Sequence, residues 1–294
     1  MATFPRWAWA LIGLVGCAPA AGPQRASSES TAAAPTPAQP ASTHAPIARD
    51  AALAQLDGHT TQERVARLVA WLHDRMPWVS TDYRERTVDQ ILERGAGNCA
   101  DHARVLQSLL ESKGIRTRWV SEINIQPPDP GRQERAERLV KARGLGASVF
   151  GRQHNDHRWL EVWSAEAGEW FPADSAIGVV GVDGWTRARV GFRPRPAAIE
   201  EMIVPFVVVA RSPGEPAEDR TRAYLVAGFD QAYGGRLRAL PTWQAWTEEV
   251  VALSAHGQAA MRGEANLHEH DGEMTKLLET YRRLKADAAA AAID

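Results

Sequence analysis

The stretch ERGAGNCADHARVLQSLLESKG, residues 93–114, places a cysteine at the start of a predicted helix. Asn98 is a residue type that caps helix N-termini, and Gly114 is one that ends helices. Between them the apolar residues Ala103, Leu106, Leu109 and Leu110 follow helical spacing. Cys99 is therefore predicted to lie in the first helical turn, directly after a turn that contains Gly95 and Gly97.

This position matters for the chemistry of the thiol. In a first helical turn the thiol faces unpaired backbone N–H groups and the positive end of the helix dipole, which favour the thiolate. The same N–H groups can receive an oxyanion. A thiolate that attacks an acyl carbon also needs a base, and the base needs an acceptor that orients it. The alternative is a small buried apolar residue, which free cysteines often are.

The N-terminus accounts for the other of the two cysteines. Arg6 precedes an apolar run, residues 7–15, that is too short to span a bilayer as a mature helix and is typical of a signal peptide. The run ends in LVGC, residues 14–17, which resembles the lipobox of bacterial lipoproteins. That resemblance implies cleavage before Cys17 and its acylation; ordinary cleavage near residues 18–20 is the alternative. By analogy with other lipoproteins, Ala18 after this cysteine favours the outer membrane, facing the periplasm.

Composition divides the chain into four parts. We predict a signal peptide at 1–16, a disordered tether rich in Ala, Pro and Ser at 17–49, a globular domain at 50–184 and a mixed, largely helical C-terminal extension at 185–294. The net charge is −2, from 34 basic and 36 acidic residues, which argues against a nucleic-acid partner. In an oxidising compartment Cys99 would have no disulfide partner.

Candidates for the base and its acceptor lie in the sequence HRWLEVWSAEAGEWFPADSA, residues 157–176. It predicts two strands, 158–164 and 170–173, joined by a turn at Gly168. His157 then begins one strand and Asp174 ends the other, so that folding brings these two ends together. The simple hairpin register does not place them directly opposite each other, and we expect a bulge or a longer loop. A further strand is predicted at 115–125.

Two other features of the sequence bear on the fold and on metal binding. Pro205, within the apolar run 202–210, indicates an edge strand or a bulge. Two amphipathic helices follow it. His154 and Asp156 beside His157 could be mistaken for a metal cluster, but no fourth ligand at helical spacing supports one, and we expect polar loop residues there. His268 and His270 in LHEHD are expected in a solvated turn, with metal binding as the alternative.

Taken together, GNC at 97–99, HRWLEVW at 157–163 and EWFPADS at 169–175 resemble the transglutaminase-like superfamily in order, spacing and flanking residues. The resemblance covers roughly residues 60–180. It implies an α+β, papain-like fold in which an antiparallel sheet packs on the nucleophile helix. Residue by residue, it implies Cys99 as nucleophile, His157 as general base and acid, and Asp174 as orienter of the imidazole. No metal or cofactor is required.

The same resemblance implies a second oxyanion donor, a side chain upstream of the cysteine. The candidates are Trp78, Tyr83 and Gln90. The expected function is an exported, lipid-anchored thiol enzyme that forms an acyl-enzyme on Cys99 from peptide, isopeptide or glutamine amides. Hydrolysis, as a cysteine protease or amidase acting on envelope or cell-wall peptides, is favoured over transamidation, an acyltransferase reaction that cross-links proteins.

The alternative is a non-catalytic peptide- or cell-wall-binding module on the same fold. The expected partners are protein or peptide substrates and a membrane reached through the lipid anchor, with no nucleic acid. The polar insertion at 126–147 could cover the groove as a lid.

Overall fold

The computed structural model describes residues 44–79, 86–125, 155–192, 204–262, 264–265 and 267–293. Contacts between Cα atoms gather Ser42–Asp294 into one compact unit. The predicted signal peptide, Cys17, most of the tether, Tyr83 and the insertion at 126–147 lie outside the described ranges. Within those ranges, no helix is both long and apolar enough to cross a membrane.

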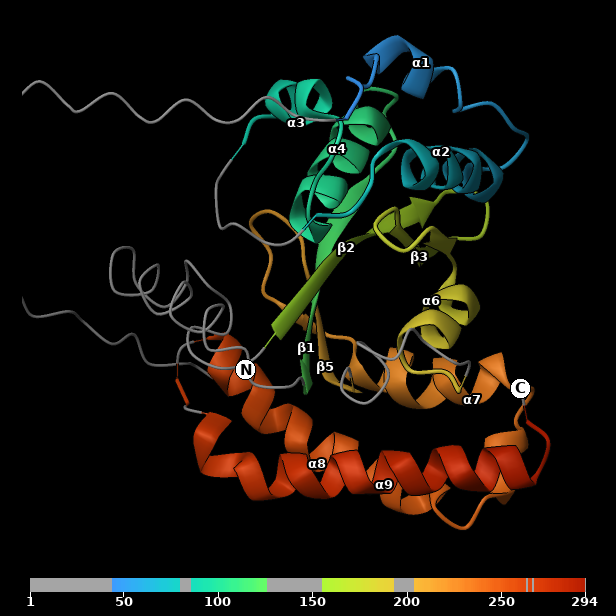
Figure 1. Cartoon of the computed structure of the whole chain (residues 1–294), viewed down its shortest axis with the longest axis vertical. Coiled ribbons are helices and arrows are strands. Elements are labelled where there is room, and N and C mark those ends of the chain that lie inside the picture. Colours follow the sequence, from blue (N-terminus) through green and yellow to red (C-terminus); the bar gives the residue numbers. More distant parts are fainter. Residues whose placement is uncertain are drawn as a thin grey trace, which may run out of the picture. The chain divides into compact units, whose positions relative to one another are not determined.

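A six-stranded antiparallel sheet forms the centre of this unit (Figure 1). The strands are β1 (Thr117–Ile125), β2 (Asn155–Ser164), β3 (Glu169–Asp174), β4 (Val179–Val180), β5 (Val204–Arg211) and β6 (Glu218–Asp219), in the order β4-β3-β2-β1-β5-β6. The predicted hairpin is confirmed, and its turn contains Gly168 at a φ of 68°. β2 begins three residues earlier than predicted, so His157 lies inside the strand.

Helices cover the sheet. They are α1 (Arg49–Leu53), α2 (Thr61–Arg75), α3 (Val88–Arg94), α4 (Cys99–Glu111), α6 (Val182–Arg189), α7 (Phe229–Ala232), α8 (Trp243–Met261) and α9 (Asp271–Ala290), with a π-helix at Ala223–Gly228 and short 3-10 turns at Arg236–Ala239 and Leu267–His270. α2 and α3 begin with capping boxes at Thr60 and Thr87. In such a box the N-cap side chain accepts the backbone N–H of the residue three positions later, and the side chain of that residue accepts the N-cap N–H. These two bonds fix where each helix starts.

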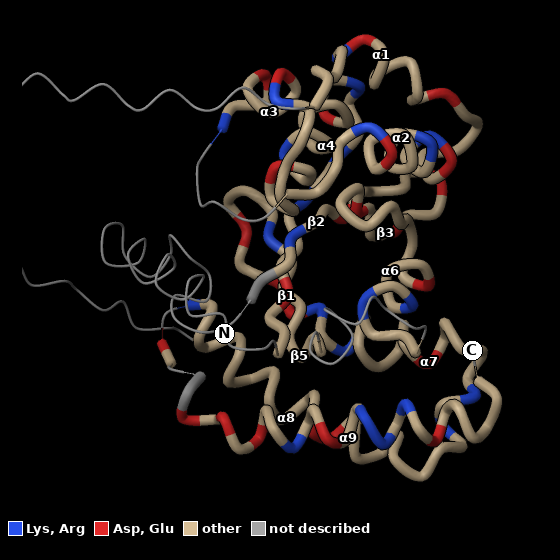
Figure 2. Tube along the Cα trace, viewed as in Figure 1, with Lys and Arg blue, Asp and Glu red and all other residues tan. Residues whose placement is uncertain are grey.

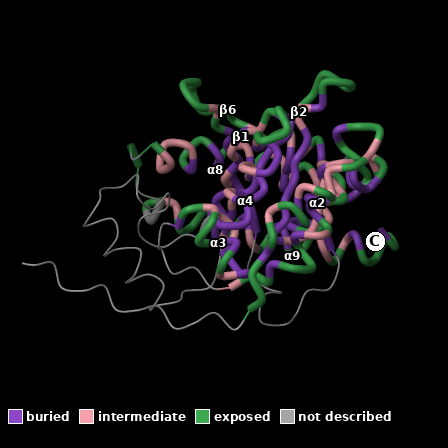
Figure 3. Tube along the Cα trace, turned by 90° about the horizontal axis from the view of Figure 1, so that it is seen from above, coloured by how far each residue is buried: buried purple, intermediate pink, exposed green. Residues whose placement is uncertain are grey.

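Two hydrophobic cores lie on opposite faces of the sheet, with helices on either side of it (Figure 1). The buried residues are concentrated in the middle of the fold (Figure 3). Leu160 and Val162 of β2 belong to the core formed with α1–α4, whereas Trp159 belongs to the core formed with β5 and α6–α9. This alternation follows from the two-residue period of a strand. The fold is therefore α+β, with an antiparallel sheet packed on the helix that begins at Cys99 and a helical C-terminal part, as predicted.

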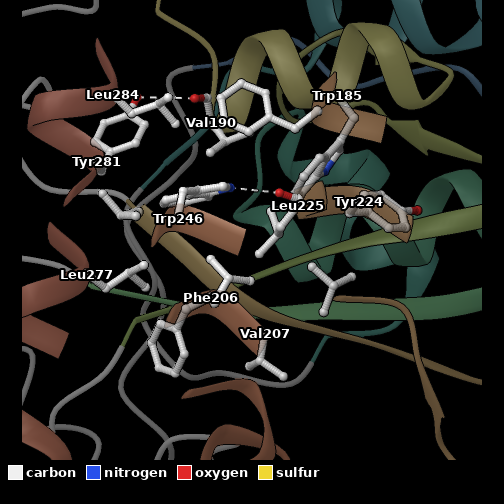
Figure 4. Packing of buried hydrophobic residues seen from close by; sticks show 14 of the residues in the cluster. Trp185, Val190, Phe206, Val207, Tyr224, Leu225, Trp246, Leu277, Tyr281 and Leu284 are labelled. Atoms are coloured by element: carbon white, nitrogen blue, oxygen red, sulfur yellow. Dashed lines mark hydrogen bonds between the residues drawn. The ribbon is translucent and has the colours of Figure 1, made fainter. Parts of the chain in front are cut away.

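The C-terminal part packs on the same sheet and gives it β5 and β6. Figure 4 shows its core, in which Trp246 Nε1 donates a hydrogen bond to the Leu225 carbonyl at 2.9 Å. The Tyr281 hydroxyl donates to the Val190 carbonyl at 3.2 Å. These bonds satisfy polar groups that the packing removes from water. The predicted domain limits at 184/185 stay a prediction.

Pro205 sits at an irregularity of the sheet. β5 pairs with β1 on one side and β6 on the other, so the edge-strand alternative was wrong. The register between β1 and β5 shifts between Ile123 and Asn124, and Asn124 lies opposite Pro205. A residue without an N–H can be accommodated at such a bulge, so the bulge alternative is confirmed.

Charged side chains of both signs are spread over the fold (Figure 2). One buried carboxylate links the β1–β2 strands to the C-terminal part of the chain. Glu161 is fully buried. Its Oε2 accepts from Arg118 Nε at 2.7 Å, and its Oε1 accepts from Arg220 Nε at 3.1 Å and from the Tyr224 hydroxyl at 2.7 Å. Breaking a buried pair of this kind is strongly destabilising, because it leaves a charge without compensation. The network therefore ties β1 and β2 to the π-helix that carries Tyr224.

Candidate active site

The candidate nucleophile lies at a capped helix N-terminus. Asn98 Oδ1 accepts hydrogen bonds from the N–H groups of Ala100 at 2.9 Å and Asp101 at 3.1 Å. Asp101 Oδ2 accepts the Asn98 N–H at 3.3 Å and forms a buried ion pair with Arg86 at 3.6 Å. Cys99, partly exposed, is the first helical residue, and its own N–H is not among those that the cap uses. That N–H is available for an oxyanion.

The chain just before the cysteine is held by backbone pairing. Trp78 and Gly97 form an isolated parallel bridge, in which the Val79 N–H donates to the Gly97 carbonyl at 2.9 Å. A Cβ atom at Gly97 would lie 2.5 Å from both Asp101 Cβ and Met76 Cε. Only glycine fits there, which explains the residue type two positions before the cysteine.

β2 and β3 bring His157 and Asp174 together in the ordinary hairpin register. Leu160 lies opposite Ala173, so Asp174 falls opposite Trp159 and is a diagonal neighbour of His157 on the same face. Diagonal neighbours are within reach of long and aromatic side chains. His157 Nε2 lies 2.5 Å from Asp174 Oδ2. The expectation that a bulge or longer loop is needed was therefore wrong, because it considered only directly opposite residues.

Further contacts orient both side chains. Asp174 Oδ1 accepts the Ala176 N–H at 3.0 Å, which leaves Oδ2 for the imidazole. The His157 ring stacks on Trp159, with centroids 5.6 Å apart and planes at 23°. The Ser175 hydroxyl donates to the His102 carbonyl at 3.5 Å, a long bond that joins the end of β3 to the first turns of α4. The strand ends and the helix N-terminus thus meet.

The charge state of His157 is set by opposing influences. Burial, the largest, favours the neutral ring and lowers its pKa, and the nearby charge of Arg189 acts in the same direction. The charge of Asp174 and hydrogen bonds with Asp174 and the Cys99 thiol outweigh both, and the pKa is raised to about 10. With Nε2 bonded to Asp174, Nδ1 is the nitrogen left for the thiol. His157 is therefore an imidazolium at neutral pH.

This raised pKa predicts a pH-dependent stability difference between the parent and Asp174→Asn. A group whose pKa rises from 6.5 to about 10 on folding adds stability that is complete below pH 6.5 and lost as the pH rises through about 10. Without the Asp174 charge this contribution disappears. Urea unfolding should show the largest difference in unfolding free energy between the two proteins at pH 6 and a much smaller one at pH 10. A difference that grows with pH would contradict the assignment.

The upstream oxyanion candidates differ in their surroundings. Trp78 is 55% exposed, and its backbone pairs with Gly97, two residues from the candidate nucleophile. Gln90 Oε1 accepts the Thr87 N–H at 2.9 Å, so this side chain serves the capping box of α3. Tyr83 lies outside the described residues. Within the described part, no group of three or more His, Cys, Asp or Glu residues could hold a metal ion.

Three further buried polar residues, to which the sequence analysis assigns no role, lie near His157. His102, the fourth residue of α4, is buried, and burial lowers its pKa to about 4. Glu122 lies directly opposite His157 in the β1–β2 pairing, and Arg189 of α6 forms an ion pair with it. Strand alternation could have placed Glu122 on the His157 face. No local signal points to Arg189, which is brought there by the tertiary fold.

One comparison, with protein-family models, agrees with the motifs. Residues 50–175 match the family model of the transglutaminase-like superfamily. A crystal structure described as that of a "putative cysteine protease" from Cytophaga hutchinsonii is similar at 15% identity and a TM-score of 0.29, over 58% of this chain and 50% of that one. Rad4–Rad23 bound to a 6-4 photoproduct UV lesion is similar at 14% identity and a TM-score of 0.33, over 77% of this chain and 47% of that one.

The chain spans about half the length of these two solved structures. No curated protein matches it.

Proposed function

This chain belongs to the transglutaminase-like superfamily through residues 50–175, and on that premise we propose that it is a thiol enzyme acting on amides. It forms an acyl-enzyme on Cys99 from peptide, isopeptide or glutamine amides and passes the acyl group to water or to an amine. The observation that carries the proposal is the convergence of the Cys99 thiol, the His157 imidazole and the Asp174 carboxylate at one helix N-terminus.

In the first half-reaction the Cys99 sulfur attacks the acyl carbon. A C–S bond forms, and the carbonyl π electrons move onto the oxygen. The Cys99 N–H at the start of α4 is one donor for this oxyanion, and Trp78, next to Gly97 in the backbone pairing, is the candidate for the second. Because His157 is protonated at neutral pH, it faces the sulfur as an imidazolium and favours the thiolate.

Collapse of the tetrahedral intermediate breaks the C–N bond. His157 gives its proton to the departing nitrogen, which leaves as ammonia or an amine, and a thioester remains on Cys99. The imidazole is now neutral. It takes a proton from the incoming water or amine as that nucleophile attacks the thioester. It keeps this proton when the C–S bond breaks and the sulfur leaves as the thiolate, which restores the starting ion pair. Asp174 holds the ring through Nε2 in both halves.

Hydrolysis and transamidation differ only in the second nucleophile. We favour hydrolysis of envelope or cell-wall peptides by an exported enzyme anchored through lipid on Cys17 and facing the periplasm. The support for this location is the LVGC sequence at residues 14–17 and the apolar run before it.

The test uses the full chain carrying Cys17→Ser, which leaves Cys99 as the only thiol. A glutamine-containing peptide, a dipeptide amide and a γ-glutamyl-lysine isopeptide are offered with and without a fluorescent primary amine. We expect release of ammonia or amine from at least one substrate, a transient thioester mass on Cys99, and more acid product than amine adduct. Binding of the peptides without release or thioester would instead favour the non-catalytic module.

A further inference from the structure

His157 has a carboxylate-bearing residue on each of the two strands beside β2. Asp174 of β3 is bonded to its Nε2. Glu122 of β1 is its directly opposite partner. In an antiparallel pair, opposite residues point to the same face with Cβ atoms about 5 Å apart. Glu122 is fully buried, so water does not screen its charge from the imidazole.

Two other side chains contact the oxygens of Glu122. Arg189 Nη2 donates to its Oε1, and Arg189 Nε lies 3.5 Å from its Oε2. Asn124 Nδ2 also donates to Oε1, at 2.8 Å. Arg189 is itself buried and comes from the last residue of α6, beyond the residues that match the family model. The pair thus joins the C-terminal part of the chain to the strand beside the catalytic histidine.

Without the arginine, Glu122 would compete for the imidazole. An imidazolium beside two buried carboxylates can donate to both, through Nε2 and Nδ1. Nδ1 is the nitrogen left for the Cys99 thiol once Nε2 is bonded to Asp174. A ring that donated to Glu122 through Nδ1 would no longer face the sulfur. With Arg189 in place, the Glu122 charge is neutralised and its oxygens are occupied.

We propose that Arg189 is a positioning residue for His157: by pairing with Glu122 it reserves the imidazole for Asp174 and Cys99. The role of His157 in catalysis rests on the function proposed above. The competition of the two carboxylates for its ring does not depend on that function. The arginine acts through Glu122 and the ring, and it takes no part in bond making.

The other ionisable groups around the ring are accounted for. Within the described part of the chain, those facing His157 are Cys99 and His102 of α4, Glu122 of β1, Asp174 of β3 and Arg189 of α6. His73 of α2 acts on His102. His102 is neutral above its pKa of about 4. Between pH 5 and 8 the balance at His157 is therefore set by the two carboxylates, the arginine and the thiol.

The test is a double-mutant cycle in the full chain with Cys17→Ser, read out by the rate of iodoacetamide alkylation of Cys99 between pH 5 and 9. Arg189→Gln should lower the rate at pH 6 about tenfold, because a ring that donates to Glu122 no longer stabilises the thiolate. Removing both charges, as Glu122→Gln with Arg189→Gln, should return the rate to within about threefold of the parent. Arg189→Lys keeps the charge and should alkylate like the parent.

Circular dichroism and urea unfolding of each variant show whether it is folded. A purely structural role predicts that the double variant is as slow as Arg189→Gln, and that result would overturn the proposal. So would a parent-like rate in Arg189→Gln. If Arg189→Gln fails to fold, a folded Arg189→Lys that alkylates tenfold more slowly than the parent overturns it instead. Amide turnover is not used, so its absence counts against the proposed function and leaves this inference standing.

Discussion

Cys99→Ala should abolish amide turnover and leave the fold intact. Without the thiol no acyl-enzyme can form. Because the members of a triad act as a unit, the loss of one lowers kcat nearly as much as the loss of all three, by roughly 10⁴ to 10⁶. Amine release from the substrate found active above, measured for the parent and the variant in the Cys17→Ser chain, checks this. An alanine variant as active as the parent would contradict the enzyme proposal.

The fold should tolerate this change because the Cys99 side chain contributes little to the packed core. It is partly exposed, and the cap made by Asn98 and Asp101 does not involve its side chain. The buried residues of α4 lie further along the helix. We expect the free energy of unfolding to change by less than about 1 kcal/mol. The matched control is Cys99→Ser, which keeps a polar group of similar size. It should lose nearly as much turnover, which would show that the thiol itself is required.

Local signals predicted the elements that carry the candidate triad. Asn98 was recognisable as an N-cap from its residue type, and the structure has it at the start of α4, in a capping box with Asp101. The Gly168 turn and the alternation around it predicted the β2–β3 hairpin. These features depend on a few neighbouring residues, so a sequence contains all the information needed to place them.

Long-range relations could not be predicted in the same way. The diagonal contact of His157 with Asp174 depends on the register of β2 and β3 and on the twist at the strand ends. The place of β5 inside the sheet depends on its pairing with both β1 and β6, which the sequence around Pro205 does not specify. Arg189 is 67 residues from Glu122. Such contacts are set by how whole elements pack, and no local pattern encodes them.

Asp174→Asn should have the second-largest effect, a loss of roughly 10³ to 10⁴ in kcat/KM. The Ala176 N–H donates to Oδ1 at 3.0 Å and should hold the amide oxygen of the asparagine in that place. The amide nitrogen then occupies the position of Oδ2, facing Nε2 of His157. Two donors meet there while the ring is an imidazolium. The ring must therefore give up the Nε2 proton or rotate away from the thiol.

The pH profile separates this effect from simple loss of structure. The Asp174 charge is the strongest influence that raises the pKa of His157, and without it burial and Arg189 lower that pKa. The imidazolium required to protonate the leaving nitrogen should then be lost at lower pH. In the parent, kcat/KM should decline on the alkaline side only as the pH approaches 10, whereas in Asp174→Asn the decline should begin near or below neutrality.

Asp174→Glu serves as the control for that profile, because it keeps the charge and changes only the reach of the side chain. It should reduce the rate through poorer geometry while its alkaline decline stays closer to that of the parent than to that of the asparagine variant. Equal profiles in the parent and Asp174→Asn, with Asp174→Asn folded by circular dichroism, would mean that Asp174 does not hold the proton on His157. The imidazole would then have to be oriented by its stacking on Trp159 and by the Arg189–Glu122 pair alone.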